Sequence, residues 1–159
     1  MQGNPQVIAK LNELLAAELT SIDQYFVHSQ MYHNWGYQRL YQRIDHERDD
    51  EIGHATRLIA RILFLGGIPN VAARTALRIG ADVPAMLKND LITEYEVANA
   101  LKQAIALAES VQDFVTRKML LDLLDDTEQD HAHWLEQQLG ILNAVGLENY
   151  LQSQTGAAE

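Results

Sequence analysis

The stretch DDEIGHATRLIARILFLGG, residues 49–67, decides the fold. It belongs to a long helical pattern whose apolar face carries two polar residues. Glu51 and His54 are three positions apart, so they lie on the same face of a helix. The rest of that face is apolar: Leu40, Ile44, Leu58 and Leu65. Gly66 and Gly67 at the end of the stretch predict a firm helix stop. An acid and an imidazole are therefore expected in the core of this helix.

Outward from this stretch, apolar residues recur at helical spacing in three further long segments. Helix starts are predicted at Asn4-Pro5 and at Asp82-Pro84, because a polar cap and a nearby proline favour the first turn. One helix from 84 to 140 would be too long for a compact domain, so a turn is predicted near Gln112 and Asp113. The predicted helices run from 5 to a break at 34–36, from 37 to 65, from 84 to the turn, from the turn to 146, and from 147 to 152.

The segment 66–83 is the longest one without helical periodicity. Helices of this length are about 40 Å long, whereas a fully extended segment of this size reaches up to about 60 Å. The segment can therefore cross the whole bundle and make the second and third helices parallel. The prediction is an all-α four-helix bundle with one long crossover and a short C-terminal fifth helix, in a single domain over residues 1–159. The breaks at 34–36 and 66–83 argue against the alternative, a coiled coil.

The composition restricts the partners of the chain. Twenty-two acidic residues against twelve basic ones give a net charge of −10, which disfavours nucleic acid and anionic membranes and favours cations. The absence of cysteine excludes disulfides, thiolate metal sites and cysteine nucleophiles. The N-terminal sequence lacks the pattern of a signal peptide, and no apolar run approaches the ~20 residues of a membrane span. The expected location is the cytoplasm.

Each predicted long helix interrupts its apolar stripe near its middle with acidic residues or histidine. Glu18 lies in the first helix and Glu94 in the third, while the second and fourth each carry a Glu-x-x-His pair. One such pair alone is usually a surface pair, but six residues at mid-helix core positions of four helices are hard to obtain by chance. The candidate ligands are Glu18, Glu51, His54, Glu94, Glu128 and His131.

Four buried carboxylates would repel one another, at a cost of several kcal/mol each, unless they had cationic partners. Two divalent cations would cancel their charge. Carboxylates and imidazoles without sulfur suit iron or manganese, and zinc less selectively. The pattern matches the known ligand set of di-iron carboxylate bundles, in which two helices give a Glu and two give Glu-x-x-His. A dinuclear metal site is the prediction.

Three other residues could contribute to such a site. Tyr25 lies one stripe step beyond Glu18 and could hydrogen-bond a ligand or donate an electron, or it could be a core tyrosine with a satisfied hydroxyl. His46 and Asp50, four positions apart, could bind a secondary, transit iron or could form a solvated ion pair. The remaining histidines show no partner pattern and are interpreted as surface or interface residues: His28, His33 and His133.

With these motifs in place, the chain resembles the bacterioferritin branch of the ferritin family. The resemblance rests on MQGNPQVIAKLNELLAAEL, DQYFVHSQMYHNWG, HERDDEIGHA, RILFLGGIPN, DTEQDHAHWLEQQL and GLENYLQSQ, which cover nearly the whole chain. It implies a ferritin-like bundle in which the six candidate residues bind a di-iron pair, bridged by Glu51 and Glu128. It also implies a hollow cage of 24 subunits. Such a cage oxidises Fe(II) with O2 or H2O2 and stores the ferric mineral, and the short last helix lines a symmetry-axis pore.

The chain departs from this family at Ile52. Bacterioferritins bind haem between two subunits through a methionine immediately after the bridging Glu of the second helix. Isoleucine has no lone pair for iron, so this chain resembles the haem-free subunit type, and haem is not expected for this chain alone. Some relatives of this type co-assemble with a methionine-bearing, haem-binding subunit, so the homo-oligomer and the mixed cage stay open. A further alternative is a di-metal oxidase or peroxidase that stores no iron.

Overall fold

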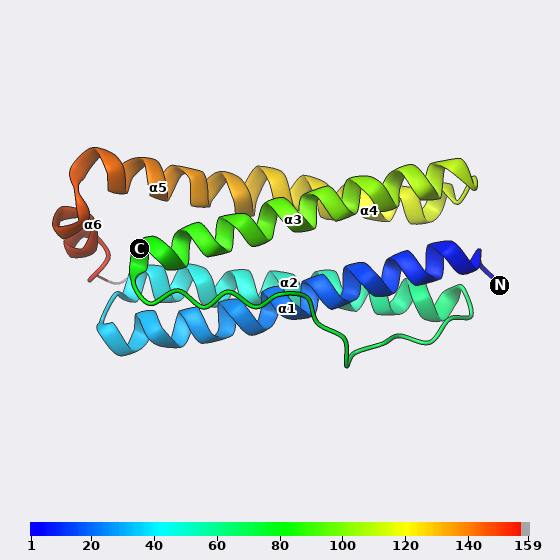
Figure 1. The fold of residues 1–159 in the computed structure, drawn as a ribbon, viewed down its shortest axis with the longest axis horizontal. Coiled ribbons are helices and arrows are strands. Elements are labelled where there is room, and N and C mark those ends of the chain that lie inside the picture. The colour runs from blue at the N-terminus through cyan, green and yellow to red at the C-terminus, as the bar shows by residue number, and fades with distance from the viewer. Residues whose placement is uncertain (157–159) are drawn as a thin grey trace.

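The structure, a computed structural model, describes residues 1–156, and these residues form helices and no strand (Figure 1). The π-helix η1 joins α4 and α5 into one continuous rod, so the described residues form a bundle of four long helical rods, and α6 lies at one end of it. The predicted all-α bundle with a short C-terminal helix is therefore confirmed. The elements are α1 (Pro5–Trp35), α2 (Gln38–Phe64), α3 (Val83–Ser110), α4 (Phe114–Asp126), η1 (Thr127–Ala132), α5 (His133–Val145) and α6 (Leu147–Ser153).

Local capping explains where the helices begin and end. The Asn4 side chain accepts a hydrogen bond from the backbone N–H of Gln6 at 2.8 Å, and this starts α1. Asp82 starts α3 in the same way, accepting from the N–H of Ala85 at 2.9 Å. Gly36 ends α1 with a φ of 84°, a left-handed conformation that glycine adopts without strain. The helix limits predicted from these residues agree with the structure to within a residue or two.

The long connection between α2 and α3 crosses the bundle, as predicted. It leaves α2 at one end and returns beside α1 to the other end, so that α2 and α3 run in the same direction (Figure 1). Its last part is held by backbone N–H groups that donate to side chains of α1: Thr75 to Thr20 Oγ1 at 2.8 Å, Arg78 to Gln24 Oε1 at 3.0 Å and Gly80 to His28 Nε2 at 3.1 Å.

Two apolar clusters fill the bundle on either side of a polar layer. One cluster includes Leu11, Leu58 and Leu101, and the other includes Leu40 and Leu87. Along α1, α2 and α3 the buried acidic residues lie between these two clusters. The polar residues thus lie near the middle of the bundle, with one apolar cluster on each side along its length. Within residues 1–156, no helix has the length and apolarity needed to cross a membrane.

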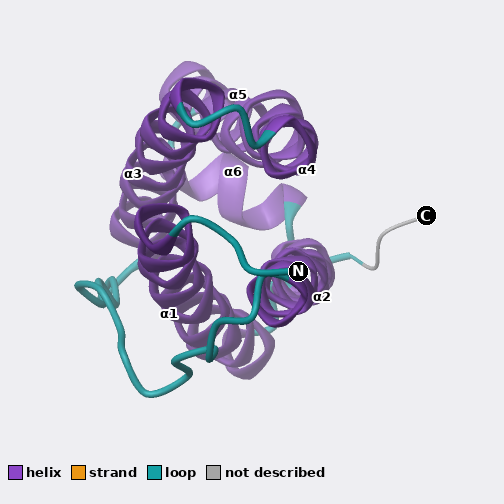
Figure 2. Ribbon diagram, turned by 90° about the vertical axis from the view of Figure 1, so that its right-hand side faces the viewer, coloured by secondary structure: helices purple, strands orange, loops and turns teal. Residues whose placement is uncertain are grey.

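The end of the bundle is closed by α6, which lies across it when the bundle is viewed end-on (Figure 2). Tyr150 of α6 is fully buried, and its hydroxyl donates to Gln138 Oε1 at 2.8 Å. This contact docks the short helix onto α5. A seven-residue helix has little stability of its own, so tertiary packing holds it in place.

The middle of the fourth rod is a π-helix, which the sequence pattern did not predict. A π-helix pairs residue i with i+5, so one turn takes more residues than in an α-helix. Consequently Thr127 and His131, four positions apart, are both buried in η1. The α-helical spacing assumed for Glu128 and His131, three positions apart, does not apply here. This local change determines which side chains reach the centre of the bundle.

Candidate metal centre

Five of the six predicted ligands meet inside the bundle. Glu18 comes from α1, Glu51 and His54 from α2, Glu94 from α3 and His131 from η1, and none is more than 4% exposed. Their ligand atoms form two groups, within each of which all atoms lie within 4.8 Å: Glu18–Glu51–His54 and Glu51–Glu94–His131. Because Glu51 belongs to both groups, this arrangement can hold two cations joined by one carboxylate.

The two imidazoles contact different oxygens of Glu51. His54 Nδ1 lies 3.2 Å from Glu51 Oε2 and 3.6 Å from Glu18 Oε1. His131 Nδ1 lies 2.9 Å from Glu51 Oε1 and 3.7 Å from Glu94 Oε1. The two rings stack with centroids 5.6 Å apart and an interplanar angle of 16°. Each oxygen of Glu51 therefore faces a different imidazole, as a bridging carboxylate would.

Several buried ligand atoms lack a hydrogen-bond partner. These atoms are both carboxylate oxygens of Glu18, Oε2 of Glu51, Oε2 of Glu94 and Nδ1 of His54. Leaving such groups desolvated and unpaired costs about 1–3 kcal/mol each, and more when they are charged. Cations with oxygen and nitrogen ligands would satisfy all of them at once. The residues present therefore fit a pair of divalent metal ions.

Acidic side chains outside the two groups orient the imidazoles. His54 Nε2 lies 3.1 Å from Asp126 Oδ2, and His131 Nε2 lies 2.9 Å from Glu47 Oε2. Each ring thus presents Nδ1 to the centre and Nε2 to an outer carboxylate. Such carboxylate–histidine pairs are typical of metal sites, where they set the ring orientation and raise the basicity of the ligand. Asp126 and Glu47 were both missed in the sequence interpretation.

In the absence of metal, the centre holds protons between its carboxylates. Burial raises the pKa of Glu18 well above its usual range, and the charge of Glu51 adds to this. Burial and the same charge raise the pKa of Glu94 to about 7. Burial lowers the pKa of His54, but the nearby carboxylates of Glu18 and Glu51 outweigh burial and raise it to about 11. The pKa of His131 is also raised, because its contacts with carboxylates, first that of Glu47 and then those of Glu51 and Glu94, outweigh burial.

Glu51 has the opposite shift. Burial alone would raise its pKa, but the neighbouring Glu18 carboxyl and the imidazole of His131 outweigh burial and lower it. The shared carboxylate thus keeps its negative charge while its neighbours carry protons. A cation that enters this centre must displace those protons, so its binding releases them.

Tyr25 contacts a candidate ligand directly. It is buried, and its hydroxyl donates a short hydrogen bond to Glu94 Oε1. Burial, reinforced by the charges of Glu94 and Asp90, raises the pKa of the phenol well above its usual range. Of the roles considered from sequence, the contact is the one expected of a residue that positions a ligand, and the role of electron donor stays a prediction.

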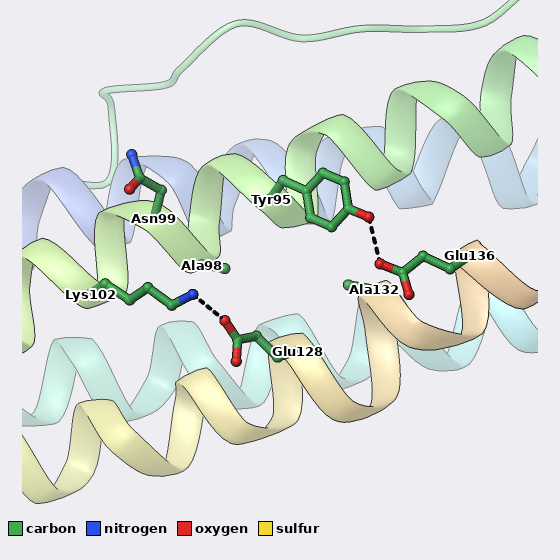
Figure 3. Close-up of a pocket in the computed structure, with 7 residues that line it drawn as sticks. All are labelled: Tyr95, Ala98, Asn99, Lys102, Glu128, Ala132 and Glu136. Atoms are coloured by element: carbon green, nitrogen blue, oxygen red, sulfur yellow. Dashed lines mark hydrogen bonds and ion pairs between the residues drawn. The ribbon is translucent and has the colours of Figure 1, made fainter.

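The structure does not bring Glu128 to the other five residues. Its side chain is 43% exposed and pairs with Lys102, with Nζ 2.5 Å from Oε1 (Figure 3). The π-helix is the physical reason, because it turns Thr127 inward where an α-helix with His131 inside would place Glu128. The role of Glu128 as a second bridge stays a prediction.

A further acidic group adjoins the centre and includes one of the two residues predicted for a secondary iron. Asp50 lies with Glu47, Asp130 and His131 so that their ligand atoms are within 4.8 Å of one another. His46 is not one of these four residues; its side chain is 64% exposed, and its Nε2 lies 3.3 Å from Asp50 Oδ2, which is the ion pair considered as the alternative. The signal for Glu47 was present in the sequence, since Glu47 precedes Glu51 by one helical turn and shares its face.

The interpretation of His28 as a surface or interface residue was wrong. His28 is fully buried, with Nδ1 2.8 Å from Asp90 Oδ1, and Nε2 accepts the hydrogen bond from the N–H of Gly80. Gln24 Nε2 also donates to Asp90 Oδ1, at 2.7 Å. This network ties the crossover to α1 and α3. Sequence spacing could not reveal it, because the two partners of each of these hydrogen bonds are more than fifty positions apart in the chain.

Ile52 lies on the outer side of α2 and is 46% exposed. On the same side, the guanidinium of Arg48 lies 5.0 Å from the centroid of the Phe26 ring, and Phe26 is 50% exposed. Exposed apolar side chains of this size at neighbouring positions of α1 and α2 are a feature of protein–protein contact surfaces.

Comparison with known proteins agrees with this geometry. The ferritin-like domain model matches residues 8–145. The chain is 53% identical to a bacterial ferritin of Synechocystis sp. and 54% identical to one of Neisseria meningitidis serogroup B, in each case over 97% of the chain and 99% of the relative. It is 42% identical to a bacterioferritin of Mycolicibacterium paratuberculosis over 94% of each protein.

Proposed function

Since this chain belongs to the ferritin-like family, we propose that it is an iron-storage ferroxidase that oxidises Fe(II) to Fe(III) at its intrasubunit dinuclear centre. The observation that carries this proposal is the pair of ligand groups that share Glu51, each with one further carboxylate and one imidazole. A site with two equivalent halves suits the oxidation of two Fe(II) ions by one oxidant, because each ion supplies one electron.

The residues of the chain have distinct tasks in this reaction. Glu18 and His54 bind one Fe(II), Glu94 and His131 bind the other, and Glu51 binds both. Two Fe(II) ions and two protons reduce O2 to H2O2, or reduce H2O2 to two molecules of water. The protons that binding displaces from His54, His131 and Glu94 are available for these reductions. Tyr25 holds Glu94 in position through its hydrogen bond.

We propose further that the chain assembles into a cytoplasmic cage of 24 subunits that deposits ferric mineral in its interior. Support comes from the exposed apolar side chains on α1 and α2, which suit subunit contacts. The short helix α6 is proposed to line a pore of the cage. Because Ile52 offers no ligand atom, a cage of this chain alone is not expected to bind haem there, whereas co-assembly with a haem-binding subunit would supply it.

A second candidate is a dinuclear oxidase or peroxidase that does not store iron. The same ligand groups favour it, since they specify the chemistry of the centre and not the fate of the product. The two candidates differ in assembly: only the first requires a hollow cage with an electron-dense core.

The first experiment is stopped-flow absorbance of the metal-free protein after addition of about two Fe(II) per subunit in air, the loading of a dinuclear site. The proposal expects a fast ferric phase that saturates near that loading. Slow oxidation that does not saturate, as in buffer, would contradict it. Electron microscopy after repeated additions of iron then separates storage, with dense cores, from a non-storing oxidase.

A further inference from the structure

A guanidinium reaches into the acidic group beside the dinuclear centre, which consists of Glu47, Asp50, Asp130 and His131. Arg43 precedes Glu47 by one turn of α2, and its Nε forms a short ion pair with Glu47 Oε1. Its Nη2 donates to Asp130 Oδ1 at 2.7 Å. The guanidinium therefore bridges two carboxylates of the group that come from different elements, α2 and η1.

A third contact helps to fix the guanidinium in this place. The Cζ atom of Arg43 lies 4.9 Å from the centroid of the Trp134 ring in α5, so a cation–π interaction adds to the two ion pairs. The Arg43 side chain is 27% exposed, which makes its ion pairs stronger than those of an open surface. Because an arginine is always protonated in proteins, Arg43 is a permanent cation at this position.

The acidic group needs such a cation. Glu47 is 2% exposed, and neither of its oxygens has a hydrogen-bond partner. A buried carboxylate in this situation depends on a nearby positive charge. Arg43 supplies one unit of charge, whereas a divalent ion would supply two. Three carboxylates and one imidazole within 4.8 Å of one another are also ligands that divalent transition metals accept.

His131 links this group with the dinuclear centre. Its Nδ1 faces the centre, 2.9 Å from Glu51 Oε1. Its Nε2 faces the acidic group, 2.9 Å from Glu47 Oε2 and 3.7 Å from Asp50 Oδ2. A neutral imidazole has a free lone pair on only one of its two nitrogens, so it cannot bind a metal ion on each side at once. A metal ion in the acidic group would therefore compete with the centre for this ring.

We propose that Arg43 is a built-in cation that keeps a further metal ion out of the acidic group and so reserves His131 for the dinuclear centre. Arg43 acts through Glu47 and Asp130, so it is a positioning residue. Its effect on the centre rests on the proposed function. The exclusion of an ion from the acidic group does not, because it depends only on the charges within that group.

The test counts the Co(II) ions that the metal-free protein binds, by calorimetric titration and visible absorbance. Co(II) is chosen because air does not oxidise it at such a site. Arg43→Gln removes the charge and is expected to bind one Co(II) ion per subunit more than the wild type. Arg43→Lys keeps the charge and should bind the same number as the wild type. Addition of Asp130→Asn to R43Q should weaken the added ion at least about tenfold, because a ligand is lost.

Arg48→Gln is the matched control. Arg48 also belongs to α2, and its side chain is 23% exposed and contacts two acids, Asp45 and Asp49. Its guanidinium lies 5.0 Å from the centroid of the Phe26 ring. The substitution R48Q thus removes the same set of interactions outside the acidic group, and this variant should bind as many Co(II) ions as the wild type.

Equal Co(II) counts in R43Q and the wild type would overturn the proposal. An added ion in R43K would overturn it as well, since charge would not be the cause, and so would an added ion in R48Q. Failure of the proposed function gives a different result. A wild type that binds no pair of ions and oxidises Fe(II) slowly contradicts that function, whereas the difference between R43Q and the wild type still decides whether Arg43 excludes an ion.

Discussion

The hydroxyl of Tyr25 is the group through which this core residue contacts a candidate metal ligand. Tyr25→Phe removes the hydrogen bond to Glu94 and leaves that carboxylate less stabilised in its charged form. We expect Co(II) to bind about three- to tenfold more weakly at this half of the centre, the usual worth of such a hydrogen bond. Tyr32→Phe is the matched control, because Tyr32 is also buried in α1 but its hydroxyl has no partner.

The same pair of variants tests electron donation. A Y25F protein with unchanged Co(II) affinity but slower Fe(II) oxidation in stopped-flow would contradict the positioning role and indicate an electron donor. Y32F is expected to retain both the affinity and the rate.

Glu18 and His131 belong to opposite halves of the centre, so each should be indispensable for the oxidation of an iron pair. In Glu18→Ala and in His131→Ala the fast oxidation phase should fall at least tenfold, since even residues that only orient metal ligands cost about that much. Assembly, measured by size-exclusion chromatography, should be intact. Glu13→Ala alters an exposed acid on the same helix as Glu18 and should oxidise iron normally. A normal rate in E18A or H131A would refute the ligand assignment.

The protons held at the centre make the stability of the metal-free protein depend on pH. Glu94, with its pKa raised to about 7, and His54, with its pKa raised to about 11, both bind protons more tightly when folded than when unfolded. The stabilisation that Glu94 gives the folded protein is complete below its unfolded-state pKa of about 4.3 and is lost as the pH rises to about 7. The stabilisation from His54 is complete below its unfolded-state pKa of about 6.5 and is lost as the pH rises to about 11.

The free energy of unfolding of the metal-free protein should therefore fall as the pH rises from about 4.3 to about 11, first through Glu94 and then through His54. Urea denaturation measures this slope, and His54→Gln should flatten it. His46→Gln, which changes an exposed histidine, should leave the slope as it is. Cation affinity should rise over the same interval, because binding releases the protons. A stability that rises with pH in the wild type would contradict this account of the centre.

Among the elements, η1 decides the ligand set. A π-helix holds one residue more than the α-helical register on both sides requires, so deletion of Thr127 should restore a continuous α-helix from α4 to α5. Glu128 would then take the inward place of Thr127, three positions from His131. We expect two Co(II) ions per subunit to bind more tightly than in the wild type, measured by calorimetric titration of the metal-free protein.

A deletion elsewhere in the same rod provides the control. Removal of Gln137, an exposed residue of α5, rotates everything after it by about 100° and should strongly lower the thermal stability. Deletion of Thr127 should leave the circular dichroism melt close to that of the wild type. If the two deletions destabilise the protein equally, η1 is not a removable insertion.

At the scale of the whole molecule, Ile52 bears on the contact between subunits. Ile52→Met places a thioether at the position where the resemblance to bacterioferritins implies a haem ligand shared by two subunits, so a cage of this variant should bind haem and show a Soret band at half an equivalent per subunit. Ile92→Met is the control, because Ile92 of α3 is almost equally exposed, 43% against 46%. Haem bound equally by I52M and I92M, or by neither, would contradict the proposed subunit contact on α1 and α2.

The bundle itself was predictable because its signals are local. Asn4 and Asp82 cap helices with their own side chains, and Gly36 ends one by adopting a left-handed conformation. The ligand residues of α1, α2 and α3 were predictable for a related reason: in a regular α-helix, residues on the buried stripe stay on it. Glu18, Glu51, His54 and Glu94 therefore face the interior as their spacing indicated.

The sequence by itself determined the helix limits, the long crossover and the residue types that can serve a dinuclear centre. Only the tertiary structure decided the outward position of Glu128, the acidic neighbours Glu47 and Asp130 of His131, and the burial of His28 against Asp90. The physical reason is the range of the forces. Caps and stripes depend on neighbours within a turn or two, whereas the register of η1 and the pairing of buried charges depend on contacts between helices that are distant in the chain.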